Sequence, residues 1–134
     1  MSRILRIGIL FLLFASWCAQ AQDYAREKRW AEEGVPDVVV GDGVWRKEKG
    51  GREFLGLYTA VKGAERAVLL VHGIGVHPNH GVIGVLRVAL ADMGYATLSI
   101  QMPIEAADAT TKDYYPKLFP EAIERIGVGA AWLA

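Results

Sequence analysis

The sequence has few of the residues on which several protein classes depend. Cysteine occurs once, at Cys18, so an internally disulfide-bonded scaffold is excluded. Neither sign of charge prevails, because 15 Lys and Arg face 15 Asp and Glu, whereas a nucleic-acid binder normally carries a basic surplus. No Gly-x-Ser-x-Gly occurs, and Ser99 is the only serine beyond residue 21. At 52% hydrophobic residues, the chain is too apolar for a disordered polymer, and its length suits one domain.

Residues 1–21 have the three parts of a secretory signal peptide. Arg3 and Arg6 form a basic start, and an apolar run of 11 residues follows from Ile7 to Trp17. Ala19-Gln20-Ala21 then supplies the small residues that a signal peptidase requires. We therefore predict cleavage between Ala21 and Gln22, and a mature protein that is periplasmic or secreted.

Two alternatives to cleavage remain open for this segment. An uncleaved anchor is one, although the apolar run is shorter than the roughly 20 residues of a spanning helix. A lipoprotein acylated at Cys18 is the other, and the bulky Trp17 before it disfavours that interpretation. After cleavage the chain would have no stable membrane span and no thiol.

The mature chain divides by composition into two segments, 22–52 and 53–134. The first is charged and interrupted by Gly and Pro, and we interpret it as an N-terminal arm and hairpin. The composition of Tyr24 to Glu33 favours a short polar helix, and a solvated arm is the alternative. The pattern also predicts two strand pieces, at 35–40 and 44–46, with turns at 41–43 and 47–52.

The second segment alternates strand and helix patterns, which predicts an α/β fold with a mostly parallel sheet and helices on both faces. The run AVLLVHG at 67–73 is typical of a parallel strand buried on both faces. The other expected elements are strands at 53–60 and 95–103, helices at 82–93 and 117–133, and a polar loop at 105–115.

Both helices show an apolar stripe that we expect to face the sheet. In the first helix the stripe has helical spacing, and Arg87 and Asp92 fall outside it. The stripe of the first helix comprises Val82, Val85, Leu86, Ala89, Leu90 and Met93, and that of the second Leu118, Ala122, Ile126, Ala130 and Leu133.

Ligands of open α/β sheets bind beyond the carboxyl ends of the strands, which here means the loop at 72–81 and the loop after Pro103. The first loop holds all three histidines, His72, His77 and His80. They could bind Zn²⁺, but a histidine that follows a strand is more often hydrogen-bonded to nearby backbone. We favour that second interpretation and expect neither a metal nor a cofactor.

Other polar and aromatic residues have less specific interpretations. Tyr114 and Tyr115 could line a substrate cleft or pack on the adjacent helix. Carboxylates could act in acid–base pairs, but we expect a solvated surface for them; they are Asp108, Asp113, Glu121 and Glu124.

Residues 53–133 resemble the first half of the α/β-hydrolase fold. The features that carry the resemblance are a hydrophobic strand running into His-Gly-x-Gly, then a helix, Gly-Tyr, a second strand and Pro. The run VLLVHGIGVHPNHGVIGVLRVALADMGYATLSIQMP is particularly similar to a bacterial exported branch of that superfamily whose role is undefined. The resemblance implies that 53–60, 67–72 and 97–102 are the second, third and fourth strands, and that 82–93 and 117–133 are helices A and B.

The resemblance also implies a role for the loop after the third strand. In these hydrolases that loop supplies one backbone N–H of the oxyanion hole, and Gly73, Ile74 and Gly75 occupy it here. A plain strand-to-helix turn that needs glycine for its geometry is the alternative. We expect no catalytic residue among those given, because the nucleophile, acid and histidine of the fold follow helix B.

The sequence therefore predicts an exported α/β-hydrolase-like protein that is incomplete as an enzyme, and whose complete form would hydrolyse ester-like bonds. A non-catalytic exported binding or interaction protein is the alternative, and a metal-binding histidine loop is a weaker third. The family's third strand lies between the fourth and the fifth, so we expect residues 67–71 to leave one edge open and to favour self-association. No nucleic-acid partner is expected.

Overall fold

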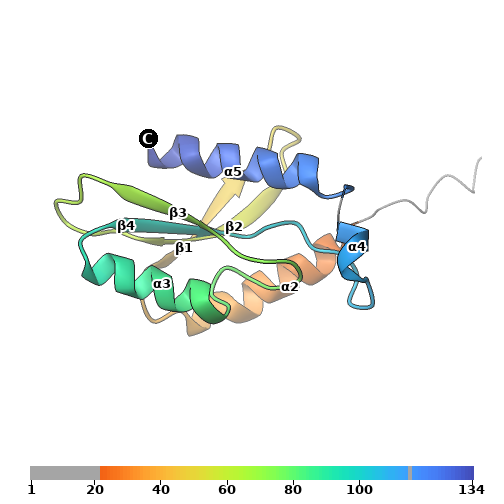
Figure 1. The fold of residues 1–134 in the computed structure, drawn as a ribbon, viewed down its shortest axis with the longest axis horizontal. Coiled ribbons are helices and arrows are strands. Elements are labelled where there is room, and N and C mark those ends of the chain that lie inside the picture. Colours follow the sequence, from red (N-terminus) through yellow and green to blue (C-terminus); the bar gives the residue numbers. More distant parts are fainter. Residues whose placement is uncertain (1–21, 115) are drawn as a thin grey trace, which may run out of the picture.

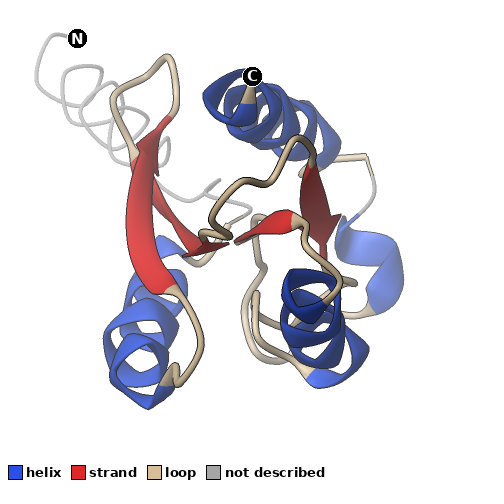
Figure 2. Cartoon of the chain, turned by 90° about the vertical axis from the view of Figure 1, so that its left-hand side faces the viewer, coloured by secondary structure: helices blue, strands red, loops and turns tan. Residues whose placement is uncertain are grey.

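The computed structural model describes residues 22–114 and 116–134 as a four-stranded sheet with helices on both faces (Figures 1 and 2). Helix α5 covers one face, and α2 and α3 cover the other. The predicted signal peptide, residues 1–21, lies outside the described residues. The elements are α2 (Tyr24–Gly34), the 3₁₀ turn η2 (Val35–Asp37), β1 (Asp42–Lys47), β2 (Glu53–Thr59), β3 (Ala67–Val71), α3 (Gly81–Asp92), β4 (Ala96–Ile100), α4 (Thr111–Tyr114) and α5 (Phe119–Leu133).

The sheet has the order β1-β2-β4-β3. β1 and β2 pair antiparallel, β2 and β4 also pair antiparallel, and only β3 and β4 are parallel. The α/β class and the helices on both faces are confirmed, but a mostly parallel sheet is wrong, because the sheet is mixed. The cause is the tight turn between β1 and β2, where the Glu48 N–H donates to the Arg52 carbonyl at 2.8 Å and reverses the chain.

The N-terminal segment differs from its prediction in one place. The expected strand at 35–40 is wrong, since Val35–Asp37 forms a 3₁₀ turn and residues 38–40 are not in a strand. Pro36 explains the difference, because its fixed φ suits the first turn of a helix and its ring nitrogen cannot donate to a sheet. The hairpin therefore forms at the second predicted turn. The predicted helix is confirmed as α2, which Asp23 caps by accepting the Arg26 N–H at 2.8 Å.

The main core lies between the sheet and α5. All five residues of β4 are buried, whereas β3 is half exposed at the sheet edge. The prediction that the 67–71 strand is buried on both faces is therefore wrong, and β4 holds that central position. A Cβ at Gly129 would lie 3.1 Å from a Leu69 methyl, so a glycine here lets α5 approach the sheet closely. The cluster comprises Phe54, Leu98, Ile100 and Met102, with Val44, Tyr58, Leu69, Ala122, Val128 and Leu133 packed against it.

The apolar stripe predicted for α3 does not face the sheet. Val82, Val85 and Met93 are 68%, 67% and 69% exposed, while Arg87 is 1% exposed. The Arg87 guanidinium donates to Asn79 Oδ1 and to the Val40 carbonyl, each at 2.8 Å, so neutral acceptors around it compensate in part for its burial.

The stripe predicted for α5 is correct in part. Leu118 is buried, and Ala122 and Leu133 pack against the core. Ile126 and Ala130 are exposed instead.

The loop predicted at 105–115 contains the short helix α4. No helix in the described part of the chain is long and apolar enough to cross a membrane.

Candidate functional site

The histidine that ends the β3 run is part of the backbone scaffold. His72 Nε2 accepts the Met102 N–H at 2.9 Å, and Nδ1 therefore carries the proton and donates to the Gly73 carbonyl at 2.7 Å. Burial lowers the pKa of His72 to about 4, so the ring is neutral near pH 7. His72 thus ties the loop after β3 to the loop after β4, and the predicted hydrogen bonding of this histidine to backbone is confirmed.

The loop Gly73-Ile74-Gly75 follows directly and lies next to Tyr114. Gly75 has a φ of 71°, and a Cβ there would lie 3.3 Å from the Tyr114 hydroxyl, so both its conformation and its surroundings favour glycine. Within the described chain, no hydrogen bond occupies the backbone N–H of Gly73, Ile74 or Gly75. The loop therefore offers free amide donors at the carboxyl end of β3.

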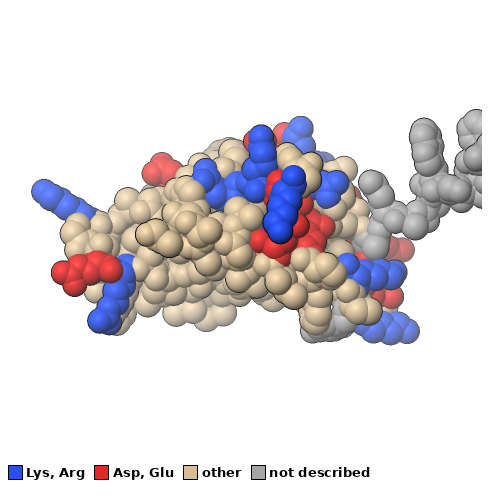
Figure 3. All heavy atoms as spheres, turned by 90° about the horizontal axis from the view of Figure 1, so that it is seen from above, with Lys and Arg blue, Asp and Glu red and all other residues tan. Residues whose placement is uncertain are grey.

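An apolar hollow of about 490 Å³ opens beside this loop. Its floor and walls come from the ends of β3 and β4 and from the first half of α5, and the buried Tyr114 is among its residues. Tyr115, the other predicted cleft residue, lies outside the described residues. Figure 3 looks onto the α5 side and shows an uncharged area between groups of charged side chains. The hollow is lined by Val71, Ile74, Met102, Leu118, Ile123 and Ile126, among others.

The remaining histidines do not join His72 in a metal site. Both ring nitrogens of His72 already have backbone partners, and the ring centroids of His77 and His80 are 5.5 Å apart. His77 Nδ1 accepts the Asn79 N–H at 3.3 Å. Among the described residues, no group of three or more His, Cys, Asp or Glu side chains is arranged to hold a metal ion.

Ser99 has the structural role that its strand position predicts. It lies in β4, fully buried, and its Oγ donates to the Pro78 carbonyl at 2.7 Å. Gln101 lies two residues further on and donates to the carbonyl of Val76 at 3.3 Å. Ser99 in β4 and Gln101 just after it therefore position the histidine loop, and Ser99 is not exposed to a substrate.

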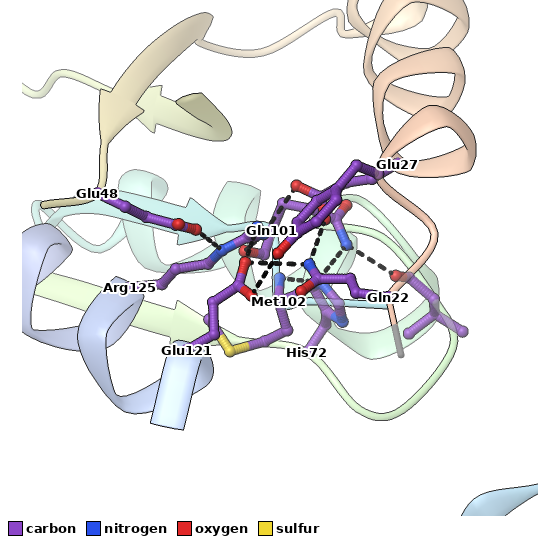
Figure 4. Close-up of polar contacts among 10 residues, drawn as sticks. Gln22, Glu27, Glu48, His72, Gln101, Met102, Glu121 and Arg125 are labelled. Atoms are coloured by element: carbon purple, nitrogen blue, oxygen red, sulfur yellow. Dashed lines mark hydrogen bonds and ion pairs between the residues drawn. The ribbon is translucent and has the colours of Figure 1, made fainter. Parts of the chain in front are cut away.

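A buried charge cluster around Arg125 was not predicted from the sequence (Figure 4). The Arg125 side chain is 0% exposed and contacts three carboxylates: Nε donates to Glu48 at 2.7 Å, Nη1 to Glu27 at 2.8 Å and Nη2 to Glu121 at 2.6 Å. Nη1 also donates to the Gln101 carbonyl at 3.0 Å. The cluster thus connects α2, the β1–β2 turn, the segment directly after β4, and α5.

The cluster corrects the prediction that Glu121 lies on a solvated surface. Burial raises the pKa of Glu27 and of Glu48, and the hydrogen bond between Glu48 and Glu121 adds to the effect on Glu48. Burial opposes ionisation of Glu121 too, but that hydrogen bond and the Arg125 charge outweigh it and lower the pKa of Glu121. The i,i+4 spacing of Glu121 and Arg125 was the one local signal in the sequence.

The other predicted carboxylates do not form an acid–base pair. Asp108 is exposed, and Asp113 accepts hydrogen bonds from the Thr110 N–H and hydroxyl, each at 2.7 Å. Glu124 accepts the Lys49 N–H. These contacts are local or structural.

Comparison with known proteins gives a family without an assigned role. A model of a family described as a protein of unknown function, DUF3530, matches residues 40–123. That range begins just before β1, ends in the N-terminal part of α5 and includes the histidine loop. Searches of curated proteins and of solved structures gave no significant match. Because the match covers more than half of the chain, the chain belongs to the DUF3530 family of proteins of unknown function.

Proposed function

We propose that this chain is an exported α/β-hydrolase-like protein, and that its Gly73–Gly75 loop and the adjoining hollow bind the acyl group of an ester-like substrate. The arrangement of the strands supports the relationship. β3 runs into the His-Gly-x-Gly loop, α3 returns the chain to the parallel strand β4, and α5 follows. In the described chain the outer edge of β3 has no partner. The α/β-hydrolase fold that the sequence resembles has its fifth strand at that edge.

The observation that carries the proposal is the position of free amide donors at the mouth of an apolar hollow. An acyl group presents an apolar chain and an oxygen that becomes negative in the transition state of hydrolysis. The aliphatic residues of the hollow suit the chain. The N–H groups of the loop suit the oxygen, since the two glycines leave the backbone uncovered.

The described residues supply binding but no activated nucleophile. Ser99 is buried and donates to a carbonyl, and both ring nitrogens of His72 are used by the backbone. Oxyanion stabilisation without attack does not give turnover. We therefore assign this chain the acyl-binding side of a hydrolase site, to which a nucleophile would have to come from elsewhere.

An NMR titration tests this assignment. Protein 22–134 labelled with ¹³C and ¹⁵N is titrated with butyrate, and with 1-butanol as a neutral ligand of the same chain length. We expect butyrate to shift the amides of Gly73, Ile74 and Gly75, and butanol to shift only the methyl groups of the hollow. Amide shifts that are equal for the two ligands, or absent with butyrate, would refute the anion-binding role.

A pair of variants at one position isolates the N–H group. Both Ile74→Pro and Ile74→Ala remove the isoleucine side chain. Only Ile74→Pro also removes the backbone N–H. The Pro variant should bind butyrate about tenfold more weakly than the Ala variant, as loss of a roughly 1.5 kcal/mol hydrogen bond to a charged group implies. Equal affinities would mean that the Ile74 amide does not contact the ligand.

An interaction module is the second candidate function, and the open edge of β3 favours it. β3 carries no charged residue, and Val71 at its end is 40% exposed. Next to it, α5 exposes Phe119, Ile123 and Ile126. Such an edge can add a strand from another chain. The self-association predicted from the sequence therefore remains a proposal.

A further inference from the structure

The Arg125 cluster also contains Gln22, the residue that follows the predicted cleavage site. Gln22 is 8% exposed, and its Nε2 donates to Glu27 at 3.2 Å and to Glu121 at 3.0 Å. The next backbone N–H, that of Asp23, donates to the Ile104 carbonyl at 2.9 Å. The side chain of Gln22 therefore reaches the carboxylates of Glu27 and Glu121, and its backbone lies no further from them than the length of that side chain (Figure 4).

The surroundings of Gln22 contain more carboxyl groups than cations. The guanidinium of Arg125 alone forms salt bridges with the three carboxylates of Glu27, Glu48 and Glu121. Glu105, the neighbour of Ile104, is 8% exposed and its Oε1 is buried without a hydrogen-bond partner among the described residues. The other titratable or charged groups nearby include Asp23, Tyr24 and Arg26 of the α2 region, and Arg52 of the β1–β2 turn, whose guanidinium lies 3.3 Å from the Tyr24 ring. His72, which also interacts electrostatically with Arg125, stays neutral above about pH 6.5 because burial lowers its pKa to about 4.

We propose that this cluster is a binding site for the α-ammonium group of Gln22 that is created when the chain is cut after Ala21. The inference rests on the export that is part of the proposed function. In the cut, water adds to the Ala21–Gln22 peptide bond, the carboxylate leaves with the signal peptide, and the new amine on Gln22 takes a proton. Before the cut that nitrogen is a neutral amide, so processing adds one positive charge where the cluster lacks one.

The expected effect depends on pH in one direction. An α-amino group has an ordinary pKa of about 7.7–8.0, and nearby carboxylates favour its charged form in the folded state. A raised pKa in the folded state adds stability that is complete below about pH 7.7 and is lost as the pH rises through the raised value. Processing should therefore stabilise the fold at neutral pH and not in alkaline solution.

The test compares purified proteins with defined N-termini, released from a cleavable fusion. One begins at Gln22, and the other begins at Ala21 and so carries its ammonium one residue further out. At about pH 6.5 the unfolding equilibrium constant of the Gln22 form should be about tenfold smaller, which corresponds to one pKa unit. At about pH 10 the two constants should agree. Equal constants at pH 6.5, or a difference that persists at pH 10, would overturn the proposal.

Variants and a direct titration distinguish stabilisation by the Gln22 ammonium from a general change in the stability of the fold. Glu121→Gln should remove the difference between the two forms, and Glu33→Gln, on the exposed end of α2, should keep it. NMR of the Gln22 amine should give a pKa about one unit above its ordinary value; an ordinary value would contradict the proposal. Intact mass identifies molecules in which Gln22 has cyclised and lost ammonia, and these should match the Ala21 form or be less stable. Because the N-termini are made in vitro, a failure of export leaves this result unaffected.

Discussion

His72 should make the folded state sensitive to mild acid. Its pKa is lowered by burial from 6.5 to about 4, so the unfolded chain binds a proton more readily than the folded chain between these values. Stability must then fall as the pH falls through 6.5. Each pKa unit corresponds to about 1.4 kcal/mol, so acidification from about pH 7.5 to pH 5 should cost roughly 2 kcal/mol through this group.

Urea unfolding of the protein and of His72→Gln at both pH values measures this contribution. The Gln variant cannot titrate, but its side-chain oxygen can still accept the Met102 N–H that Nε2 accepts in the original protein. Burial also lowers the pKa of His77, but His77 is present in both proteins, so its effect cancels in the comparison. The original protein should lose about 2 kcal/mol more than the variant, a value set by the cited shift.

The outcome that refutes this reasoning is a loss of equal size in the two proteins. It would mean that His72 can be protonated at little cost, and that its neutral ring does not hold the two loops together. An NMR titration of the His72 ring gives the same answer at the atomic level, because the ring should stay neutral until the pH approaches 4.

Three further predictions concern the buried cluster, the sheet edge and export. Arg125→Met should destabilise the fold by about 3–5 kcal/mol, because it leaves buried carboxylates without a counter-charge, whereas Arg29→Met at an exposed position should change little in urea unfolding. Val71→Lys should reduce self-association, measured by light scattering, more than Val82→Lys on α3 does. Equal effects of the two substitutions would mean that self-association does not use the β3 edge. N-terminal sequencing of protein from the envelope or medium should begin at Gln22; Met1 on soluble cytoplasmic protein would contradict export.

Local patterns in the sequence predicted most of the elements. The strand at 53–59, the strand at 67–71 and the helices at 24–34 and 119–133 follow from periodicity, caps and turn residues. The strand pairing was harder, because the pattern of a buried strand is the same whether its neighbour is parallel or antiparallel. The 3₁₀ turn at Val35–Asp37 was missed because the four valines of 35–40 outweighed Pro36 in that interpretation.

The candidate site was predictable where it rests on neighbours in the sequence. The loop at 73–75 and the burial of Ser99 follow from a strand that runs into glycine and from a serine within a strand. The Arg125 cluster was not predictable, because Glu27 and Glu48 lie 98 and 77 residues away along the chain. The exposed stripe of α3 was missed for a related reason: periodicity identifies an apolar stripe but not what covers it.

We propose that the described chain forms the acyl-binding side of a hydrolase site and supplies no nucleophile to it. Incubation of 22–134 with a fluorophosphonate, followed by intact mass, tests this most directly, with nitrophenyl butyrate hydrolysis measured in parallel. We predict no adduct and a hydrolysis rate equal to that of a heat-treated control. An adduct, or turnover that survives Ser99→Ala, would reveal a nucleophile that this account lacks, and turnover abolished by Ser99→Ala would contradict the position of Ser99 in a buried strand.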